Sequence, residues 1–234
     1  MIGMGAAVEA GSGGQVDRGA DRGNRAVREG YTRRGILSAG DERRIIEWCE
    51  AKASQALLRG GWEAVRNRAM VRLMLATGLR RAEVAGLDLE DLHLGGGDPR
   101  EWYVVVRHGK GDKRRDVPLG PAIRRVLREY VAWRKGRECS EGGVLSGALF
   151  VSERGGRMTG NGVWRVWRGV LSDVGVRGEG LGCHAARRRL ASRLAEGGAS
   201  VWVIRDILGH SDIRTTSVYV RDTLVGQVAA VAAM

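Results

Sequence analysis

The last quarter of the chain holds two histidines, an arginine and a tyrosine at spacings that suit the cleavage of a phosphodiester bond. His184 and Arg187 lie three residues apart, so on a helix both face the same side and can address one phosphate. His210 and Tyr219 follow in that order. A tyrosine that ends such a series is a candidate nucleophile.

Each remaining role in this chemistry also has a candidate. Without a metal, the reaction needs a base for the proton of the nucleophile and cations for the charge that gathers on the non-bridging oxygens. Arg80 and Arg187 suit the oxygens, because the planar guanidinium binds phosphate bidentately and stays protonated. His184 is the candidate base for Tyr219, and His210 is the candidate supporting hydrogen-bond donor.

The departing alkoxide needs an acid, and lysine can fill this role because neighbouring cations can lower its pKa. Of the 39 basic residues four are lysines, and two of these, Lys110 and Lys113, fall within Gly-Lys-Gly-Asp-Lys. Alternating β-branched residues on either side, at 102–107 and 114–119, predict a β-hairpin with lysine at its tip. We choose Lys110 as the acid and keep Lys113 as the alternative.

The segments that must hold these residues predict a mainly α domain with a small antiparallel β-sheet, an α+β fold. Ser38 and Asp41 predict a capped helix that buries Ile45, Cys49 and Ala53 on one face. Further helices are predicted by apolar periodicity and cap residues at Val65 to Gly78, 81–86, 121–135, 161–173, 184–197, 200–208 and 215–219.

Composition favours a polyanionic partner. The net charge is +12, and basic side chains that neutralise phosphates release counterions, so double-stranded DNA is the leading candidate. The three cysteines form no C-x-x-C pair, which argues against a disulfide framework or a zinc site and favours the cytoplasm. No apolar run reaches the roughly 20 residues of a membrane span, so no membrane association is expected.

Taken together, the motifs resemble the catalytic domain of the tyrosine recombinase (phage integrase) family over about residues 35 to 225. The family boxes T-G-L-R-x-x-E, G-K-G-x-K-x-R with V-P-L, H-x-x-R, L-G-H-S and T-T-x-x-Y are matched at 77–83, 109–115 with 117–119, 184–187, 208–211 and 215–219. The resemblance implies a DNA breaking-rejoining fold and a 3′-phosphotyrosyl intermediate, with no metal, ATP or other cofactor. It implies the catalytic set Arg80, Lys110, His184, Arg187, His210 and Tyr219.

Three parts of the chain are expected. Residues 1–33 are rich in glycine and read as a flexible tail, residues 34–222 as the catalytic domain, and residues 223–234 as a tail helix. The resemblance implies that such a tail docks on a neighbouring protomer, whereas its apolar stripe is equally suited to packing on its own domain. The active form implied is a homo-multimer, a tetramer on DNA.

Two departures from the family pattern carry expectations. Family members have an N-terminal core-binding domain that closes around DNA, and about 33 glycine-rich residues cannot bury enough surface to replace it. We therefore expect weaker, more salt-sensitive DNA binding unless a partner supplies that domain. After H-x-x-R the family usually continues with His-Thr-Phe, whereas Arg188, Arg189 and Leu190 stand here, which changes the packing behind the site and predicts lower activity.

The favoured function is therefore a site-specific DNA recombinase or integrase. The alternatives are a type IB topoisomerase-like nicking-closing enzyme and a truncated, non-catalytic DNA-binding regulator. Among the remaining side chains, Trp164, Trp167 and Trp202 are expected in the core. Arg188 and Arg189 are expected to be solvated.

Overall fold

The computed structural model describes residues 35–59, 61–107, 114–141, 146–210 and 216–217, with the backbone alone at 137–141. Three candidate residues, Lys110, Lys113 and Tyr219, lie outside these ranges. So do the predicted tails at 1–33 and 223–234.

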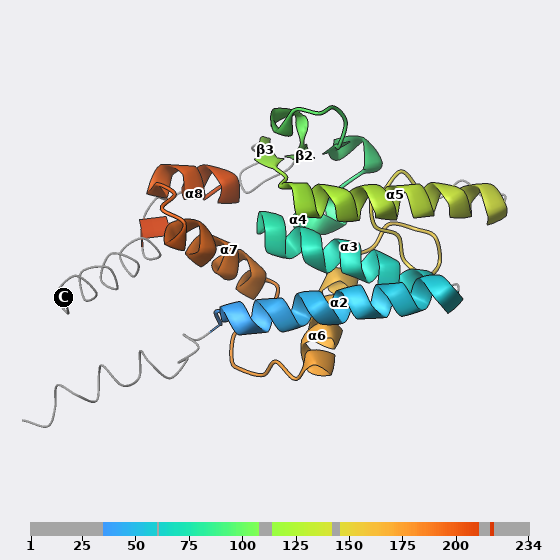
Figure 1. Ribbon diagram of the computed structural model, residues 1–234, viewed down its shortest axis with the longest axis horizontal. Helices are drawn as coiled ribbons and strands as arrows, with labels where there is room; N and C mark the ends of the chain where they lie inside the picture. The colour runs from blue at the N-terminus through green and yellow to red at the C-terminus, as the bar shows by residue number, and fades with distance from the viewer. Residues whose placement is uncertain (1–34, 60, 108–113, 142–145, 211–215, 218–234) are drawn as a thin grey trace, which may run out of the picture. The chain divides into compact units, whose positions relative to one another are not determined.

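Within the described ranges the fold is mainly helical with one small sheet, which confirms the predicted class (Figure 1). The helices are α2 (Ala39–Arg59), α3 (Trp62–Thr77), α4 (Arg81–Gly86), α5 (Pro121–Glu141), α6 (Gly160–Val174), α7 (His184–Glu196) and α8 (Val201–Leu208). Two short 3₁₀ turns span Leu89–Asp91 and Pro99–Glu101.

Helix α3 is the centre of the domain, because α2, α5, α6 and α7 all pack against it. Figure 1 shows α2, α3 and α5 running side by side, with α7 beyond the end of α3. Apolar residues of α3 are buried around its whole circumference, as expected for a helix enclosed by others. The large core that surrounds it includes Met70, Leu73 and Met74, none of which is exposed to solvent.

Helix α2 begins as its sequence predicts. The Ser38 hydroxyl accepts a hydrogen bond from the amide of Asp41 at 3.0 Å, and the Asp41 carboxylate accepts one from the amide of Ser38 at 3.1 Å. This reciprocal pair satisfies two amides that the first turn leaves without helical partners. The face with Ile45, Cys49 and Ala53 is buried, so the predicted amphipathic pattern is confirmed.

The turn between α3 and α4 requires glycine. Gly78 closes α3 in the left-handed conformation, with φ of 62°. A Cβ atom at this position would come within 2.8 Å of Leu208 Cδ2 and 3.1 Å of Leu190 Cδ2. Glycine therefore lets the backbone of the turn approach α7 and α8 closely.

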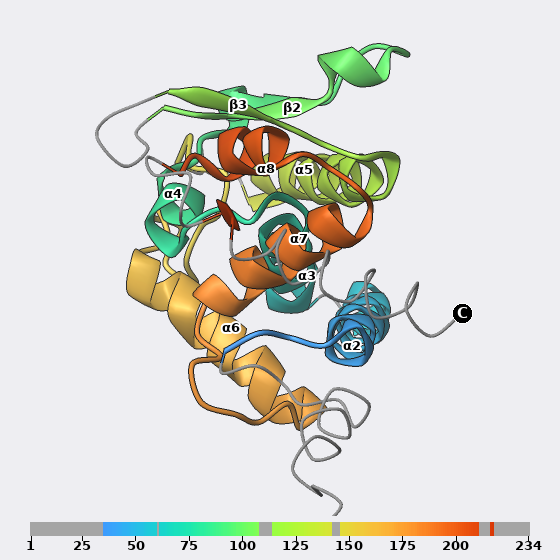
Figure 2. The same cartoon turned by 90° about the vertical axis from the view of Figure 1, so that its left-hand side faces the viewer.

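The sheet consists of β1 (Leu92–His93), β2 (Tyr103–Val106) and β3 (Arg115–Pro118) in that order, all antiparallel. Strands β2 and β3 are the predicted hairpin, with Val106 opposite Arg115. Figure 2 shows the sheet above α8 and α5. The turn that would carry Lys110 lies outside the described residues.

The prediction for the tryptophans was correct for one and wrong for two. Trp167 is fully buried, whereas Trp164 is 43% and Trp202 56% exposed. The buried stripe of α6 contains Val163, Trp167, Val170 and Leu171, and Trp164 lies at the edge of that stripe, about 75° from its centre at 100° per residue. Helix α8 buries Ile204 and Leu208, so Trp202 lies on its opposite face.

None of the helices in the described ranges is both long enough and apolar enough to cross a bilayer.

Candidate active site

Helix α7 supplies His184 and Arg187, and the side chain of Arg187 is fixed by three hydrogen bonds. Its side chain is buried, with a relative exposure of 5%. Nη1 donates to the carbonyl of Gly78 at 3.0 Å, Nη2 donates to the carbonyl of Leu208, and Nε donates to Nε2 of His210 at 3.3 Å. One guanidinium thus joins the end of α3, the end of α8 and His210, the second residue after α8.

Arg80 immediately precedes α4. Its amide and its Nη1 both donate to the Glu83 carboxylate at 2.8 Å, and its Nη2 donates to the carbonyl of Gly209 at 3.3 Å. The link between Glu83 and the Arg80 amide is the carboxylate half of a capping box. The guanidinium is partly exposed, at 23%, so it is both fixed and reachable.

Glu83 is the anion that organises the cations on this side. Its side chain is 3% exposed and also accepts two hydrogen bonds from Arg115. Burial alone raises the pKa of a carboxyl group, but the hydrogen bonds from Arg115 and Arg80 outweigh it and lower the pKa of Glu83. Glu83 therefore stays charged near neutral pH.

His210 is placed by the left-handed cap at the end of α8. Gly209 has φ of 63°, and the amide of His210 donates back to the carbonyl of Arg205 at 3.0 Å. Arginine Nε is only a donor, so Nε2 of His210 must be the acceptor and Nδ1 must carry the ring proton. Nδ1 lies 2.7 Å from the hydroxyl of Thr216, whose oxygen accepts a hydrogen bond from it.

Both histidines are neutral at pH 7. Burial, followed by the nearby charges of Arg187, Arg80 and Arg115, lowers the pKa of His210 to about 4. His184 is more exposed than His210, but partial burial and then the charges of Arg187, Arg188, Arg80 and Arg81 lower its pKa from the ordinary value. A neutral imidazole can accept a proton, which fits the role predicted for His184.

The structure thus brings together four of the six predicted residues: Arg80, His184, Arg187 and His210. Lys110 and Tyr219 lie outside the described residues. Three further residues of the network had no predicted role: Glu83, Arg115 and Thr216. Each occupies a fixed position of one of the family boxes, and that position is the sequence signal that could have indicated a role in the site.

A second charged cluster lies behind α7, and it corrects a prediction. Arg189, expected to be solvated, is 7% exposed and donates to the buried Glu42 of α2 at 2.7 Å and to Glu196 at 3.2 Å. Arg188 is half-buried and donates to the carbonyl of Gly35 at 3.2 Å. The Arg-Arg-Leu departure is therefore accommodated by an acidic partner on another helix.

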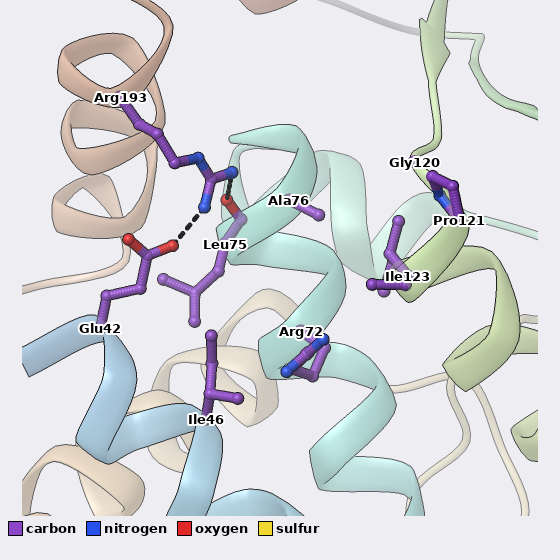
Figure 3. A pocket seen from close by; sticks show the side chains of 10 residues that line it. Glu42, Ile46, Arg72, Leu75, Ala76, Gly120, Pro121, Ile123 and Arg193 are labelled. Carbon is purple, nitrogen blue, oxygen red and sulfur yellow. Dashed lines mark hydrogen bonds and ion pairs between the residues drawn. The ribbon is translucent and has the colours of Figure 1, made fainter. Parts of the chain in front are cut away.

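Arg193 of α7 also pairs with Glu42 and donates to the carbonyl of Leu75 (Figure 3). Beside this pair lies a pocket of about 250 Å³ between α2, α3, α7 and the start of α5, with Ile46, Arg72 and Ile123 among its lining residues. None of the four predicted catalytic residues within the described ranges lines it, so it is separate from the part of the candidate site that they form.

Comparison with known proteins shows that residues 37–224 match the phage integrase family. The chain is 36% identical to tyrosine recombinase XerD of Oceanobacillus iheyensis over 160 residues. This aligned region makes up 68% of this chain and 51% of that protein. It spans about half the length of the curated XerD relatives it matches.

Solved recombinase structures are similar to this chain. The crystal structure of XerA recombinase gives a TM-score of 0.67 at 25% identity, covering 83% of this chain and 64% of that one. XerH recombinase bound to a palindromic difH substrate, in a post-cleavage complex, gives a TM-score of 0.65 at 21% identity, covering 85% and 53%. The second likeness shows a shared fold.

Proposed function

Because this chain belongs to the phage integrase family, we propose that it is a site-specific DNA recombinase that cuts and rejoins double-stranded DNA through a 3′-phosphotyrosyl intermediate. No metal ion or ATP enters the proposed reaction. The network of Arg80, Arg187 and His210 carries this proposal. It holds two guanidinium groups, one from the residue before α4 and one from α7, against the same short segment, residues 208–210.

Two fixed cations suit the transition state of phosphoryl transfer, in which negative charge is spread over the equatorial oxygens. Arg80 and Arg187 are already oriented by protein acceptors, so little reorganisation is required when charge develops. A neutral His184 beside them completes the part of the site in the described residues.

The proposed step is a displacement at phosphorus. The Tyr219 oxygen forms a bond to phosphorus while its proton passes to His184, and the bond from phosphorus to the 5′ oxygen breaks. That oxygen takes a proton from Lys110 and leaves as a 5′-hydroxyl, with Lys113 as the alternative acid. Rejoining reverses the step with a 5′-hydroxyl from a different strand, so the phosphate ester bond energy is kept.

The domain limits and partners belong to the same proposal. We assign residues 34–222 to the catalytic domain and propose that four copies assemble on DNA. The 223–234 tail either packs on its own domain or is exchanged between protomers. A partner that supplies a core-binding domain would strengthen DNA binding, and the cytoplasm remains the proposed location.

The decisive experiment traps the covalent intermediate. On a nicked suicide substrate the free 5′ end diffuses away after cleavage, so the protein-DNA adduct accumulates and can be counted on a denaturing gel. We expect an adduct with the native chain and with the control Tyr103→Phe, and none with Tyr219→Phe. An absence of adduct with the native chain at saturating DNA would overturn the proposal.

Two further assays distinguish the proposed function from its alternatives. Recombination between two sites on one plasmid is expected. Supercoil relaxation without recombination would instead identify a topoisomerase-like enzyme, and DNA binding without an adduct would identify a regulator.

A further inference from the structure

Arg115, the first residue of β3, links the hairpin to α4 and to α8. Its Nη1 and Nη2 donate to the two oxygens of Glu83 at 3.0 and 2.9 Å. The side chains of Arg115 and Glu83 are 12% and 3% exposed. A two-pronged ion pair shielded from water fixes both distance and orientation, which a single contact does not.

The same guanidinium also contacts the end of α8. Nε of Arg115 donates to the carbonyl of Ile207 at 3.4 Å. A Cβ atom on Gly209 would lie 2.9 Å from Cδ, Nε and Cζ of Arg115. The guanidinium therefore lies flat against the backbone of Gly209, in space that only glycine leaves open.

These contacts connect three separate segments of the chain. Glu83 is bonded to Arg80, Gly209 directly precedes His210, and β3 continues the hairpin that contains Lys110. Each segment thus contains one residue of the proposed catalytic set. Arg115 is the side chain that touches the first two segments directly and belongs to the third.

We propose that Arg115 is a positioning residue, which sets the placement of Arg80 and His210 relative to the hairpin without touching the DNA itself. This inference rests on the proposed function, because it concerns the same site. Its physical basis is that Glu83 cannot orient Arg80 and Arg115 independently: one carboxylate accepts from both.

A role in stability alone would predict a different pattern. Arg107, which directly follows β2, is a useful control because it pairs with Asp88, Glu90 and Asp91 in and just before the 3₁₀ turn Leu89–Asp91. Those acidic residues make no contact with Arg80 or His210 among the interactions of the described residues. Arg107→Met therefore removes an ion-pair cluster of the same hairpin, more exposed than that of Arg115, while sparing the contacts that position the site.

The test compares Arg115→Met, Arg115→Lys and Arg107→Met with the native chain. Methionine keeps the apolar stem of the side chain, and lysine keeps the charge but cannot form the two-pronged bond. Cleavage is measured in a single turnover on the suicide substrate at saturating DNA, and DNA affinity and melting temperature are measured separately. The pKa of His210 is followed by NMR.

We expect cleavage by Arg115→Met to fall roughly 10²-fold, the loss typical of a misplacement of about 1 Å, with DNA affinity little changed. Arg115→Lys should recover little of the rate. The pKa of His210 should rise in Arg115→Met, because a neighbouring positive charge is lost, and stay constant in Arg107→Met. Arg107→Met should cleave at close to the native rate.

The outcomes separate this inference from the proposed function. No adduct with the native chain would refute the function, whereas the His210 titration still reports on Arg115. Native cleavage together with full activity in Arg115→Met would overturn the inference. Equal losses of rate in Arg115→Met and Arg107→Met, in step with melting temperature, would also overturn it. If Arg115→Met fails to fold, full cleavage by folded Arg115→Lys overturns it, and a large loss supports it.

Discussion

Arg187 donates a hydrogen bond from Nε to Nε2 of His210, at 3.3 Å. This contact decides the tautomer of the imidazole, because the remaining ring proton must then be on Nδ1. That proton is directed at Thr216, three residues before Tyr219 in the sequence. Arg187, His210 and Thr216 thus form one chain of hydrogen bonds, in which each member constrains the next.

We expect Thr216→Val to lower the single-turnover cleavage rate by about tenfold or more, since a buried N–H left without an acceptor costs about 1–3 kcal/mol. Thr216→Ser keeps the hydroxyl and should retain most of the native rate. Nitrogen NMR of the His210 ring checks the cause: because Arg187 still fixes the tautomer, Nδ1 should stay protonated in both variants, but its N–H should lose its hydrogen-bond acceptor in Thr216→Val alone. Equal rates for the two variants would contradict this role.

Replacing Arg187 with methionine should destabilise the fold as well as abolish cleavage. The buried carbonyls of Gly78 and Leu208 would lose their donor, at about 1–3 kcal/mol each. Urea unfolding measures the loss, and Arg188→Met is the control, because Arg188 is only half-buried. A similar change in the free energy of unfolding for both variants would show that Arg187 is not a structural link.

Gly78→Ala should be more destabilising than Gly175→Ala by about 1–3 kcal/mol. Both glycines have positive φ, 62° and 73°, so both variants suffer the same backbone strain. Only at Gly78 would the new Cβ collide with a side chain, that of Leu208, whereas nothing lies within 4 Å at Gly175. Paired thermal or urea unfolding measurements give the difference directly, and equal losses would argue against the collision.

Stability should decrease as the pH falls from about 6.5 to about 4. The pKa of His210 is lowered from 6.5 to about 4 in the folded chain, so between these values the unfolded chain binds the proton more readily. The free energy of unfolding therefore rises with pH in this window, and the contribution of His210 is complete above pH 6.5. His210→Asn should flatten the slope in urea titrations at several pH values; an unchanged slope would mean that other groups produce it.

The pH dependence of cleavage gives an independent check. The pKa of His184 lies below 6.5, because burial and four arginines disfavour its protonation. If His184 is the base, lowering the pH from 8 to 6.5 should leave more than half of it unprotonated, and the midpoint of the acid limb of the rate profile should lie below pH 6.5. An acid limb above pH 7 would exclude His184 as the base.

Local signals in the sequence predicted most of the elements. The Ser38 and Asp41 pair, the Gly78 cap and the alternating strands each depend on residues a few positions apart, so they can be read without the fold. Strand β1 was missed because two residues, Leu92 and His93, are too few to show an alternation.

The wrong prediction for Arg189 concerned a residue whose partner is distant in the sequence. A run of three arginines resembles a solvated face, but Arg189 is neutralised by Glu42, 147 positions earlier in the chain. Likewise the motifs named Arg80 and Arg187, while their contacts with Gly209 and Gly78 span 129 and 109 positions. The roles of Lys110 and Tyr219 remain predictions that the suicide substrate tests.

The contact between Glu42 and α7 has a practical consequence for anyone who trims this chain to a minimal fragment. Leu37 is 1% exposed, and Gly35 approaches Gly180 so closely that a Cβ atom would lie 2.8 Å from its carbonyl oxygen. A fragment that begins after residue 42 would lack Glu42 and leave the buried Arg189 with only the more exposed Glu196 as a counter-charge. We expect such a fragment to aggregate, whereas one that begins at Thr32 keeps this anchor.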